Sequence, residues 1–229
     1  MPSAPASVDA DLGALPALPR RASTAEAVAG VLRSQIAHGR LLPGAQLREE
    51  KIAATLEVSR NTVRESFRLL AHERLVEHAL HKGVFVRTVG PDGIREMYRT
   101  RRLIEPLALR DVADTKATLT ALDDLVTTAE KAADAGDWEA VGTADIDFHR
   151  RLVTAANSVH LSSMFEGLLA ELRLAFLRLP DREALHEPFL RRNRSLIDLL
   201  AAGDVEAASG ELDDYLVAAE AALLEIVTA

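Results

Sequence analysis

The sequence predicts a mainly α protein in two parts, a small N-terminal head of three helices and a β-hairpin, followed by an all-α antiparallel helical bundle. Three observations support this fold class. Apolar residues recur at helical spacing from Thr24 onward. The pattern changes to that of two short strands only after Leu70. Beyond residue 94, Ala and Leu dominate and alternating β-branched runs are lacking, which favours helices packed on helices.

The head is predicted to cover residues 21–87 and to be a winged helix-turn-helix. Its third helix opens at Ser59, whose hydroxyl is a suitable N-cap. The hairpin turn ends in Lys82-Gly83 and forms the wing. The expected elements are helices from residue 24 to Gly39, over 49–56 and from residue 59 onward, and strands over 75–78 and 84–87.

The segments that flank the head lack regular patterns. Residues 1–20 are rich in Ala and Pro and predict a flexible arm. Residues 88–93 (TVGPDG) contain Gly-Pro and Asp-Gly, which break regular structure and predict a hinge. The bundle then covers residues 94–229. Its helices are expected near 92–113, 118–135, 137–156, 159–178, 184–202 and 204–227, with breaks at Gly136, Asn157, Pro180 and Gly203.

The net charge of −8 conceals an asymmetry between the two parts. Residues 21–90 carry 11 Lys and Arg against 7 Asp and Glu, whereas residues 91–229 carry 15 against 26. A basic head on an acidic body suits a module that faces phosphate, attached to a domain that stays away from DNA.

Composition also excludes several classes of site. The chain has no cysteine, so disulfides, thiolate zinc sites and cysteine nucleophiles are excluded. No apolar run approaches the roughly 18 residues that a membrane span needs, and the N-terminus lacks the pattern of a signal peptide. We therefore expect a soluble, cytoplasmic protein that is not bound to a membrane.

The helix that opens at residue 59 carries chemistry suited to DNA. Arginine can grip guanine through two hydrogen bonds, Asn can read adenine, and Ser or Thr can hold a phosphate near a helix N-terminus. Taken singly, each of these residues would more often be a solvated surface residue, so the prediction depends on their order and spacing. The predicted DNA-binding residues are Ser59, Arg60, Asn61, Thr62, Arg64 and Arg68, with His81 and Lys82 on the wing.

The run over 43–87 resembles the winged helix-turn-helix of the GntR family, whose usual form is PG, a short helix, V-S-R-x-x-V-R-E-x-L, L-V and a G-x-F-V wing. The matching residues are Pro43-Gly44, Val58-Ser59-Arg60, Val63-Arg64-Glu65, Leu75-Val76 and Gly83-Val84-Phe85-Val86. The resemblance implies that Arg60 and Arg64 are the first DNA contacts. Two positions depart from the family: Glu57 stands where the turn usually has Gly, and Glu50 stands where a fatty-acid-responsive subgroup has a DNA-contacting Arg. That subgroup's operator sequence is therefore not expected here.

Asp145 and His149 are four residues apart in a predicted helix, so they share one face. Together they could chelate zinc, nickel or manganese, although two ligands alone do not fix a metal. The alternative is an ordinary pair on a helix surface. The remaining histidines lack close liganding neighbours, and we expect surface or capping roles for His38, His72, His78, His160 and His186.

Residues 92–227 resemble the FCD effector domain of the FadR-like subfamily of GntR regulators. The motifs that carry the resemblance are Arg101-x-x-x-Glu105, Asp145-x-x-Phe148-His149-x-x-Leu152 with Ala155 and Asn157, Asn193-Arg194-x-x-Ile197, and Ala202-Gly203-Asp204-x-x-x-Ala208. In the family, the Asp and His join two later histidines around a divalent metal. Here Asn193 and Tyr215 occupy those later positions and are poorer ligands, so only half of the metal site is retained and any divalent metal is expected to bind weakly.

The same set of side chains suits an anionic ligand instead. Amide and phenol donors, a histidine and a nearby arginine can bind a carboxylate. Apart from a weakly bound divalent metal, no cofactor is predicted. The ligand is predicted to be a small acidic effector. The predicted effector-binding residues are Arg101, Asp145, His149, Asn193 and Tyr215.

These patterns predict a homodimeric transcription regulator that binds palindromic operator DNA. Repression is the expected effect, although the sequence does not decide between repression and activation. Effector binding would shift the bundle helices, rotate the two heads about residues 88–93 and spoil the spacing of the half-sites. Two alternative functions fit the sequence less well. A metal-dependent hydrolase lacks a nucleophile motif, a Gly-rich phosphate loop and a complete metal set, so we expect no enzyme. A nearly neutral or acidic recognition helix would favour a helical protein-interaction adaptor. The three arginines on this helix contradict that interpretation.

Overall fold

The computed structural model describes residues 23–113, 115–179 and 181–228, so the predicted arm over 1–20 and the predicted break at Pro180 lie outside the described residues. The mainly α fold class is confirmed. Across the described ranges, we find no helix with both the length and the apolar character to cross a membrane. The elements are α1 (Thr24–Ala37), β1 (Gln46–Leu47), α2 (Glu49–Thr55), α3 (Arg60–His72), β2 (Val76–Ala79), β3 (Gly83–Val86), α4 (Pro91–Ala113), α5 (Lys116–Asp134), α6 (Trp138–Thr154), α7 (Val159–Phe176), α8 (Arg182–Ala201) and α9 (Val205–Thr228).

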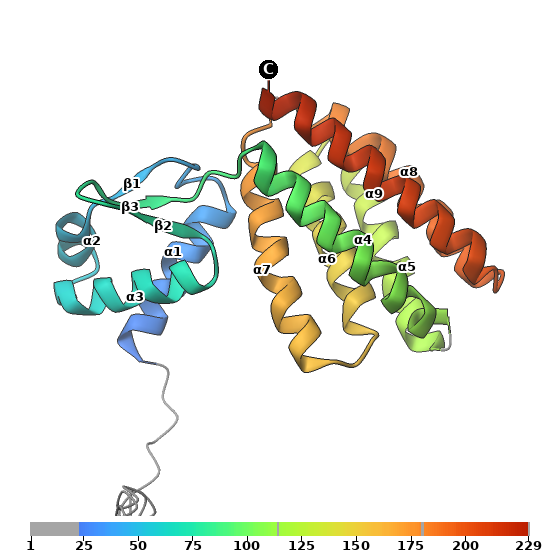
Figure 1. Ribbon diagram of the computed structural model, residues 1–229, viewed down its shortest axis with the longest axis horizontal. Coiled ribbons are helices and arrows are strands. Elements are labelled where there is room, and N and C mark those ends of the chain that lie inside the picture. Colours follow the sequence, from blue (N-terminus) through green and yellow to red (C-terminus); the bar gives the residue numbers. More distant parts are fainter. Residues whose placement is uncertain (1–22, 114, 180, 229) are drawn as a thin grey trace, which may run out of the picture.

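The head contains α1 to α3 and a small antiparallel sheet, seen on the left of Figure 1. The predicted hairpin is confirmed as β2 and β3, in which His78 pairs with Val84. The strand β1 was not predicted. It adds a third strand in the order β1-β3-β2, and its Leu47 pairs with Val84. A strand of two residues is too short to show alternation in the sequence, and its pairing partner lies far along the chain.

The turn between α2 and α3 explains one departure from the family pattern. Glu57 has a φ of 54°, in the left-handed region that favours Gly. A side chain in this region costs roughly 1–2 kcal/mol, which is why Gly is usual there. Two residues later, the Ser59 hydroxyl accepts a hydrogen bond from the Thr62 amide at 3.1 Å and starts α3 as its N-cap.

The helix α6 lies at the centre of the bundle, because it packs against α4, α5, α7 and α8. Both Asp145 and His149 belong to its buried face. Polar side chains on a helix with neighbours on four sides have little access to water, so they must find partners within the protein. In Figure 1 the two long helices α4 and α9 lie along each other on the outer side of the bundle.

The bundle helices end where the sequence predicts. Gly136, Asn157 and Gly203 have φ angles of 73°, 51° and 78°, the left-handed conformation that commonly ends a helix. The side chain of Asp137 then accepts a hydrogen bond from the Ala140 amide at 3.0 Å and caps the start of α6.

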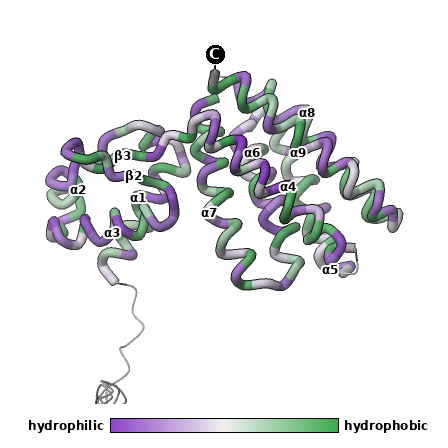
Figure 2. The backbone as a smooth tube through the Cα atoms, in the orientation of Figure 1, coloured by the Kyte–Doolittle hydropathy of each residue, from purple (hydrophilic) through white to green (hydrophobic). Residues whose placement is uncertain are grey.

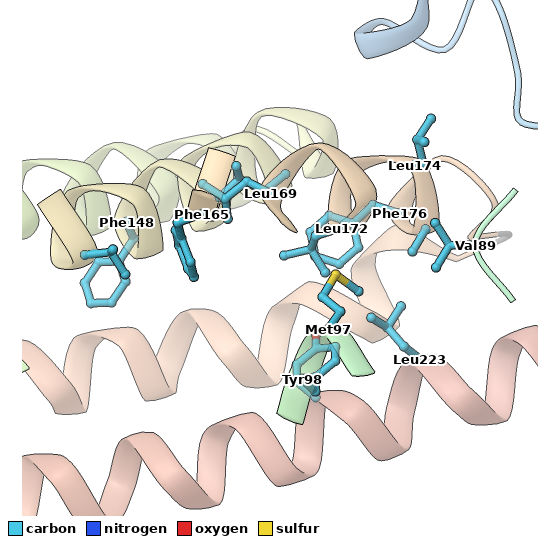
Figure 3. Packing of buried hydrophobic residues seen from close by; sticks show 14 of the residues in the cluster. Val89, Met97, Tyr98, Phe148, Phe165, Leu169, Leu172, Leu174, Phe176 and Leu223 are labelled. Carbon is cyan, nitrogen blue, oxygen red and sulfur yellow. The ribbon is translucent and has the colours of Figure 1, made fainter. Parts of the chain in front are cut away.

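The bundle helix α7 joins the head to the rest of the molecule. In Figure 3, Leu172 points from α7 toward Met97, whereas Leu174 points to the opposite side, and both leucines are fully buried. The side chain of Glu171 is only 4% exposed and forms ion pairs with Arg74 and Arg87 of the head, at 2.7 and 3.3 Å. Apolar packing and a buried carboxylate therefore hold the head against α7.

The segment predicted as a hinge is shorter than residues 88–93. The helix α4 begins at Pro91, so residues 91–93 form its first turn. Proline suits the first turn of a helix because the amide hydrogen that it lacks would have no partner there. The remaining link is held in place, since the Arg178 guanidinium donates a hydrogen bond to the Val89 carbonyl at 3.3 Å.

Candidate nucleic-acid interface and buried polar site

The outer face of α3 presents the arginines that the sequence singles out. The side chains of Arg60, Arg64 and Arg68 are 55%, 62% and 72% exposed. Opposite them, Val63, Phe67 and Leu70 are buried in the head. The apolar residues fix the orientation of α3, and the guanidinium groups remain available to a ligand in solution. In Figure 2 hydrophilic residues colour much of α2 and α3.

Each of these arginines is paired with a carboxylate. Arg60 forms an ion pair with Glu50 of α2. Arg64 Nε donates to Glu49 Oε2 at 2.8 Å, and Arg68 Nη1 donates to Glu65 Oε1 at 2.7 Å. Two successive carboxylates of α2 therefore meet two arginines of α3, a feature that the sequence analysis did not predict.

The other predicted contacts lie around the start of α3 and on the wing. The hydroxyls of Ser59 and Thr62 are 2.8 Å apart, and Asn61 next to them is exposed. His81 and Lys82 are exposed in the turn between β2 and β3, where His81 has a φ of 60°. Six of the eight predicted residues thus gather at one helix, and the other two belong to a separate element.

The predicted effector residues meet inside the bundle, although they come from four helices. The Asp145 carboxylate of α6 accepts hydrogen bonds at its Oδ1 from the Tyr215 hydroxyl at 2.7 Å and from Asn193 Nδ2 at 2.9 Å. His149 Nε2 lies 3.8 Å from the same oxygen. Arg101 of α4 is 1% exposed and lies with its Cζ 4.9 Å from the centre of the Tyr98 ring.

Glu105 links Arg101 to His149, a role that was not predicted from the sequence. Its Oε1 accepts from Arg101 Nε at 2.5 Å, and its Oε2 lies 2.6 Å from His149 Nδ1. Burial raises the pKa of this carboxyl, but the charges and hydrogen bonds of Arg101 and His149 outweigh burial and lower it overall. The signal available in the sequence was the spacing of four residues between Arg101 and Glu105.

Three polar atoms of this cluster are buried without a hydrogen-bond partner in the described structure: Arg101 Nη2, His149 Nε2 and Asn193 Oδ1. Unsatisfied buried polar atoms are unfavourable and are typical of places where a ligand or a water completes the structure. Beside Asp145 and Asn193 lies a cavity of about 10 Å³, lined by α5, α6 and α8. That volume holds about one water molecule, so a larger ligand requires these helices to separate.

One prediction for the bundle is wrong. His186 was expected in a surface or capping role, but it is 4% exposed and packs edge-on against Phe176, with ring centroids 4.7 Å apart. Burial lowers its pKa. A cavity lined by Phe176 adjoins it, and Gly142 leaves room for its ring. The imidazole fits there because Gly142 has no Cβ. Since Gly142 lies far from His186 in the sequence, local patterns around His186 do not reveal this contact.

The remaining four histidines agree with their expected roles. His38, His72, His78 and His160 are exposed. His38 follows the last residue of α1, and its Nδ1 lies 2.7 Å from the Ser34 carbonyl oxygen at that helix end.

The donor set of the buried cluster does not suit a tightly bound divalent metal. Asp145 and His149 are the strong ligands that face one another, and Asp145 Oδ1 already accepts two hydrogen bonds. The Glu105 carboxylate is hydrogen-bonded to His149 Nδ1, the ring nitrogen that faces away from Asp145, so it does not stand at a ligand position beside Asp145. Within the part of the chain that the structure describes, no three His, Cys, Asp or Glu side chains are grouped so that they could hold a metal ion.

A winged helix-turn-helix with an exposed arginine face, joined to a helical domain with a buried polar site, defines a DNA-binding transcription regulator whose activity a small molecule modulates. The chain belongs to the GntR family: residues 24–86 match the model described as "Bacterial regulatory proteins, gntR family", and residues 96–218 match the FCD domain. The alternative of an enzyme is set aside, because family and relatives are regulators.

Three similar proteins support this assignment over most of their length. The "Probable D-xylose utilization operon transcriptional repressor" of Paenarthrobacter nicotinovorans is 30% identical over 206 residues, 86% of this chain and 88% of the relative. The galactonate operon transcriptional repressor of Escherichia coli K12 is 27% identical over 200 residues, 77% of this chain and 86% of the relative. The crystal structure of a GntR regulator from Rhodococcus sp. RHA1 shares 40% identity, has a TM-score of 0.83 and covers 88% of this chain and 97% of that chain.

Proposed function

We propose that the protein is a cytoplasmic homodimeric repressor whose Arg60 and Arg64 read operator DNA. The observation that carries this proposal is the exposure of both guanidinium groups at the start of α3, beside backbone amides that favour phosphate. The relatives from Paenarthrobacter and Escherichia coli are named as operon repressors, which supports repression here. A dimer is expected because palindromic half-sites match two-fold symmetry.

A matched pair of arginine variants tests the DNA interface. Arg64→Ala should weaken operator binding in gel-shift titration. If Arg64 grips a base, the binding free energy should fall by about 1–3 kcal/mol. Arg33→Ala is the control, because Arg33, on α1 of the same head, is also exposed and paired with a carboxylate, that of Glu73. Equal losses for the two variants would contradict a specific role for Arg64. Sedimentation of the free and DNA-bound protein tests the dimer.

For the effector, the buried cluster supports a small hydroxy-carboxylate. Arg101 Nη2 can donate to a carboxylate, and Asn193 Oδ1 can accept from a hydroxyl; both atoms lack partners in the described structure. D-galactonate is the first probe, because one relative is named for the galactonate operon, and neutral D-xylose is the comparison. We expect galactonate to raise the melting temperature and Asn193→Leu to abolish the rise. Stabilisation by xylose alone would contradict an acidic effector.

The retained half of a metal site is tested by restoring the other half. Wild-type protein should bind Ni²⁺ weakly, whereas the double variant Asn193→His/Tyr215→His should bind it tightly, because imidazoles replace an amide and a phenol. Titration calorimetry with Ni²⁺ measures both. Tight binding by the wild type would show that Asp145 and His149 need no further histidines.

Effector binding reaches the head through α7 in this proposal. A ligand larger than the cavity of about 10 Å³ must separate the lining helices and displace His186, which contacts Phe176. Phe176 belongs to α7. From that helix, Arg173 Nε donates a hydrogen bond of 3.1 Å to the Ala37 carbonyl at the end of α1. Crosslinking or scattering measurements should then show a rotation of the head when effector binds, and an unchanged head would contradict this route.

A further inference from the structure

We propose that Glu50 is a specificity-determining residue. By placing a carboxylate beside Arg60 on the surface that would face DNA, it weakens binding to non-specific DNA more than binding to the operator. The inference rests on the proposed role of Arg60 in reading DNA, and it concerns a residue outside the family motif that identifies the head.

The positions of the charges support this role. Glu50 and Arg60 come from different helices, and their side chains stay 76% and 55% exposed although they form an ion pair. Glu49 and Arg64 form a neighbouring pair between the same two helices, in which Glu49 is less exposed, at 23%. These four side chains line one open groove, so the carboxylates stand on the surface that would face the duplex.

Relative strengths decide which contact survives on DNA. A pair as exposed as this one changes a binding constant by about five-fold at most. A guanidinium that grips a guanine through two hydrogen bonds tightens binding by about five-fold to about 150-fold, and this gain exists only at the right sequence. A phosphate contact exists at every base pair, and there the repulsion between Glu50 and the phosphate cancels part of the gain. The cost of releasing Arg60 from Glu50 is the same in both complexes, so this repulsion is what penalises non-specific contacts more than operator contacts.

The experiment compares two duplexes of about 30 base pairs, long enough for two half-sites one helical turn apart. One is a sequence that the wild-type protein selects from a randomised pool, and the other is its shuffled counterpart. For Glu50→Gln we expect tighter binding to both duplexes, because no ion pair then has to be broken. The gain should be at most about five-fold on the selected duplex, the size of one exposed ion pair, and larger on the shuffled duplex, where a repulsion of similar size between the carboxylate and a phosphate is also removed. The salt dependence of shuffled-duplex binding should steepen by about 0.9 in log–log slope, as for one more neutralised phosphate.

Glu73→Gln is the matched control. It removes the same charge and breaks a pair with Arg33, but Glu73 lies at the opposite end of α3. Equal effects of the two variants would overturn the proposal, because they would reflect net charge alone. Selective loss of binding to the selected duplex would also overturn it, since Glu50 would then contact a base, for instance a cytosine amino group, directly.

A double variant separates this inference from the proposed function. In an Arg60→Ala background, Glu50→Gln should have a much smaller effect on the shuffled duplex, because without Arg60 no phosphate is drawn next to Glu50. If Arg60→Ala leaves binding to the selected duplex unchanged, the proposed DNA interface itself is wrong. If Arg60→Ala abolishes that binding but Glu50→Gln changes neither duplex, only the role of Glu50 is wrong.

Discussion

Arginine–carboxylate pairs occur in both parts of the molecule, but their surroundings differ. In the head, the side chains of Arg60 and Glu50 are 55% and 76% exposed, whereas in the bundle those of Arg101 and Glu105 are 2% and 0% exposed. Water screens the first pair, so it can exchange its partner for DNA at little cost. The second pair cannot be broken without leaving a bare charge in a region of low dielectric. The same chemistry gives a releasable contact in one domain and a fixed support in the other.

The largest effect is expected at the buried pair. Glu105→Gln keeps the side chain's size but removes the charge that faces Arg101. Although burial opposes it, the charge of Glu105 raises the pKa of Arg101, so the guanidinium stays charged. We expect a loss of about 3–5 kcal/mol in the free energy of unfolding, measured by urea denaturation. Glu50→Gln should lose less than about 1 kcal/mol in the same assay. Similar losses for the two variants would remove the distinction between the domains.

The next effect concerns the apolar support of the buried site. In Gly142→Ala the added methyl group would lie 2.5 Å from His186 Nε2, closer than atoms can approach. The ring is held against Phe176, so we expect overpacking to destabilise the protein by about 1–3 kcal/mol. Gly167→Ala is the control, because no atom lies within 4 Å of the added group and α7 is a regular helix there. It should stabilise the protein by up to about 1 kcal/mol, and a loss there would point to a general intolerance of the helices.

A smaller, pH-dependent effect should separate His186 from Glu105. Burial lowers the pKa of His186 from its ordinary value of 6.5, so the unfolded chain binds a proton more readily than the folded one. Its contribution is full above pH 6.5 and is lost as the pH falls below that value. The contribution of Glu105, whose pKa is also lowered, is lost only below 4.5. Unfolding free energies between about pH 7.5 and 5 should fall less steeply in His186→Gln than in the wild type. Parallel curves would contradict a neutral, buried His186.

The sequence predicts elements better than it predicts which charges meet. Helix ends at Gly136, Asn157 and Gly203 were predictable because local backbone preferences decide them. Asp145 and His149 were predictable from their spacing, and Arg101, Asn193 and Tyr215 through a family resemblance. The structure brings them together because α4 and α8 each pack against both α6 and α9. By contrast, β1, the pairing of Glu50 with Arg60 and the burial of His186 depend on contacts between distant segments. No local pattern records such contacts.

The smallest effect on stability is expected at the exposed pair itself. A double-mutant cycle on Arg60→Ala and Glu50→Ala should give a coupling energy of about 0.2–1 kcal/mol in unfolding experiments at low salt. At 1 M salt, where the screening length is about 3 Å, the coupling should fall toward zero. The two side chains can release each other at this small cost because both remain largely in water. A coupling above about 2 kcal/mol that persists in salt would mean that the pair supports the fold of the head. Arg60 would then not be free to leave Glu50 for a base.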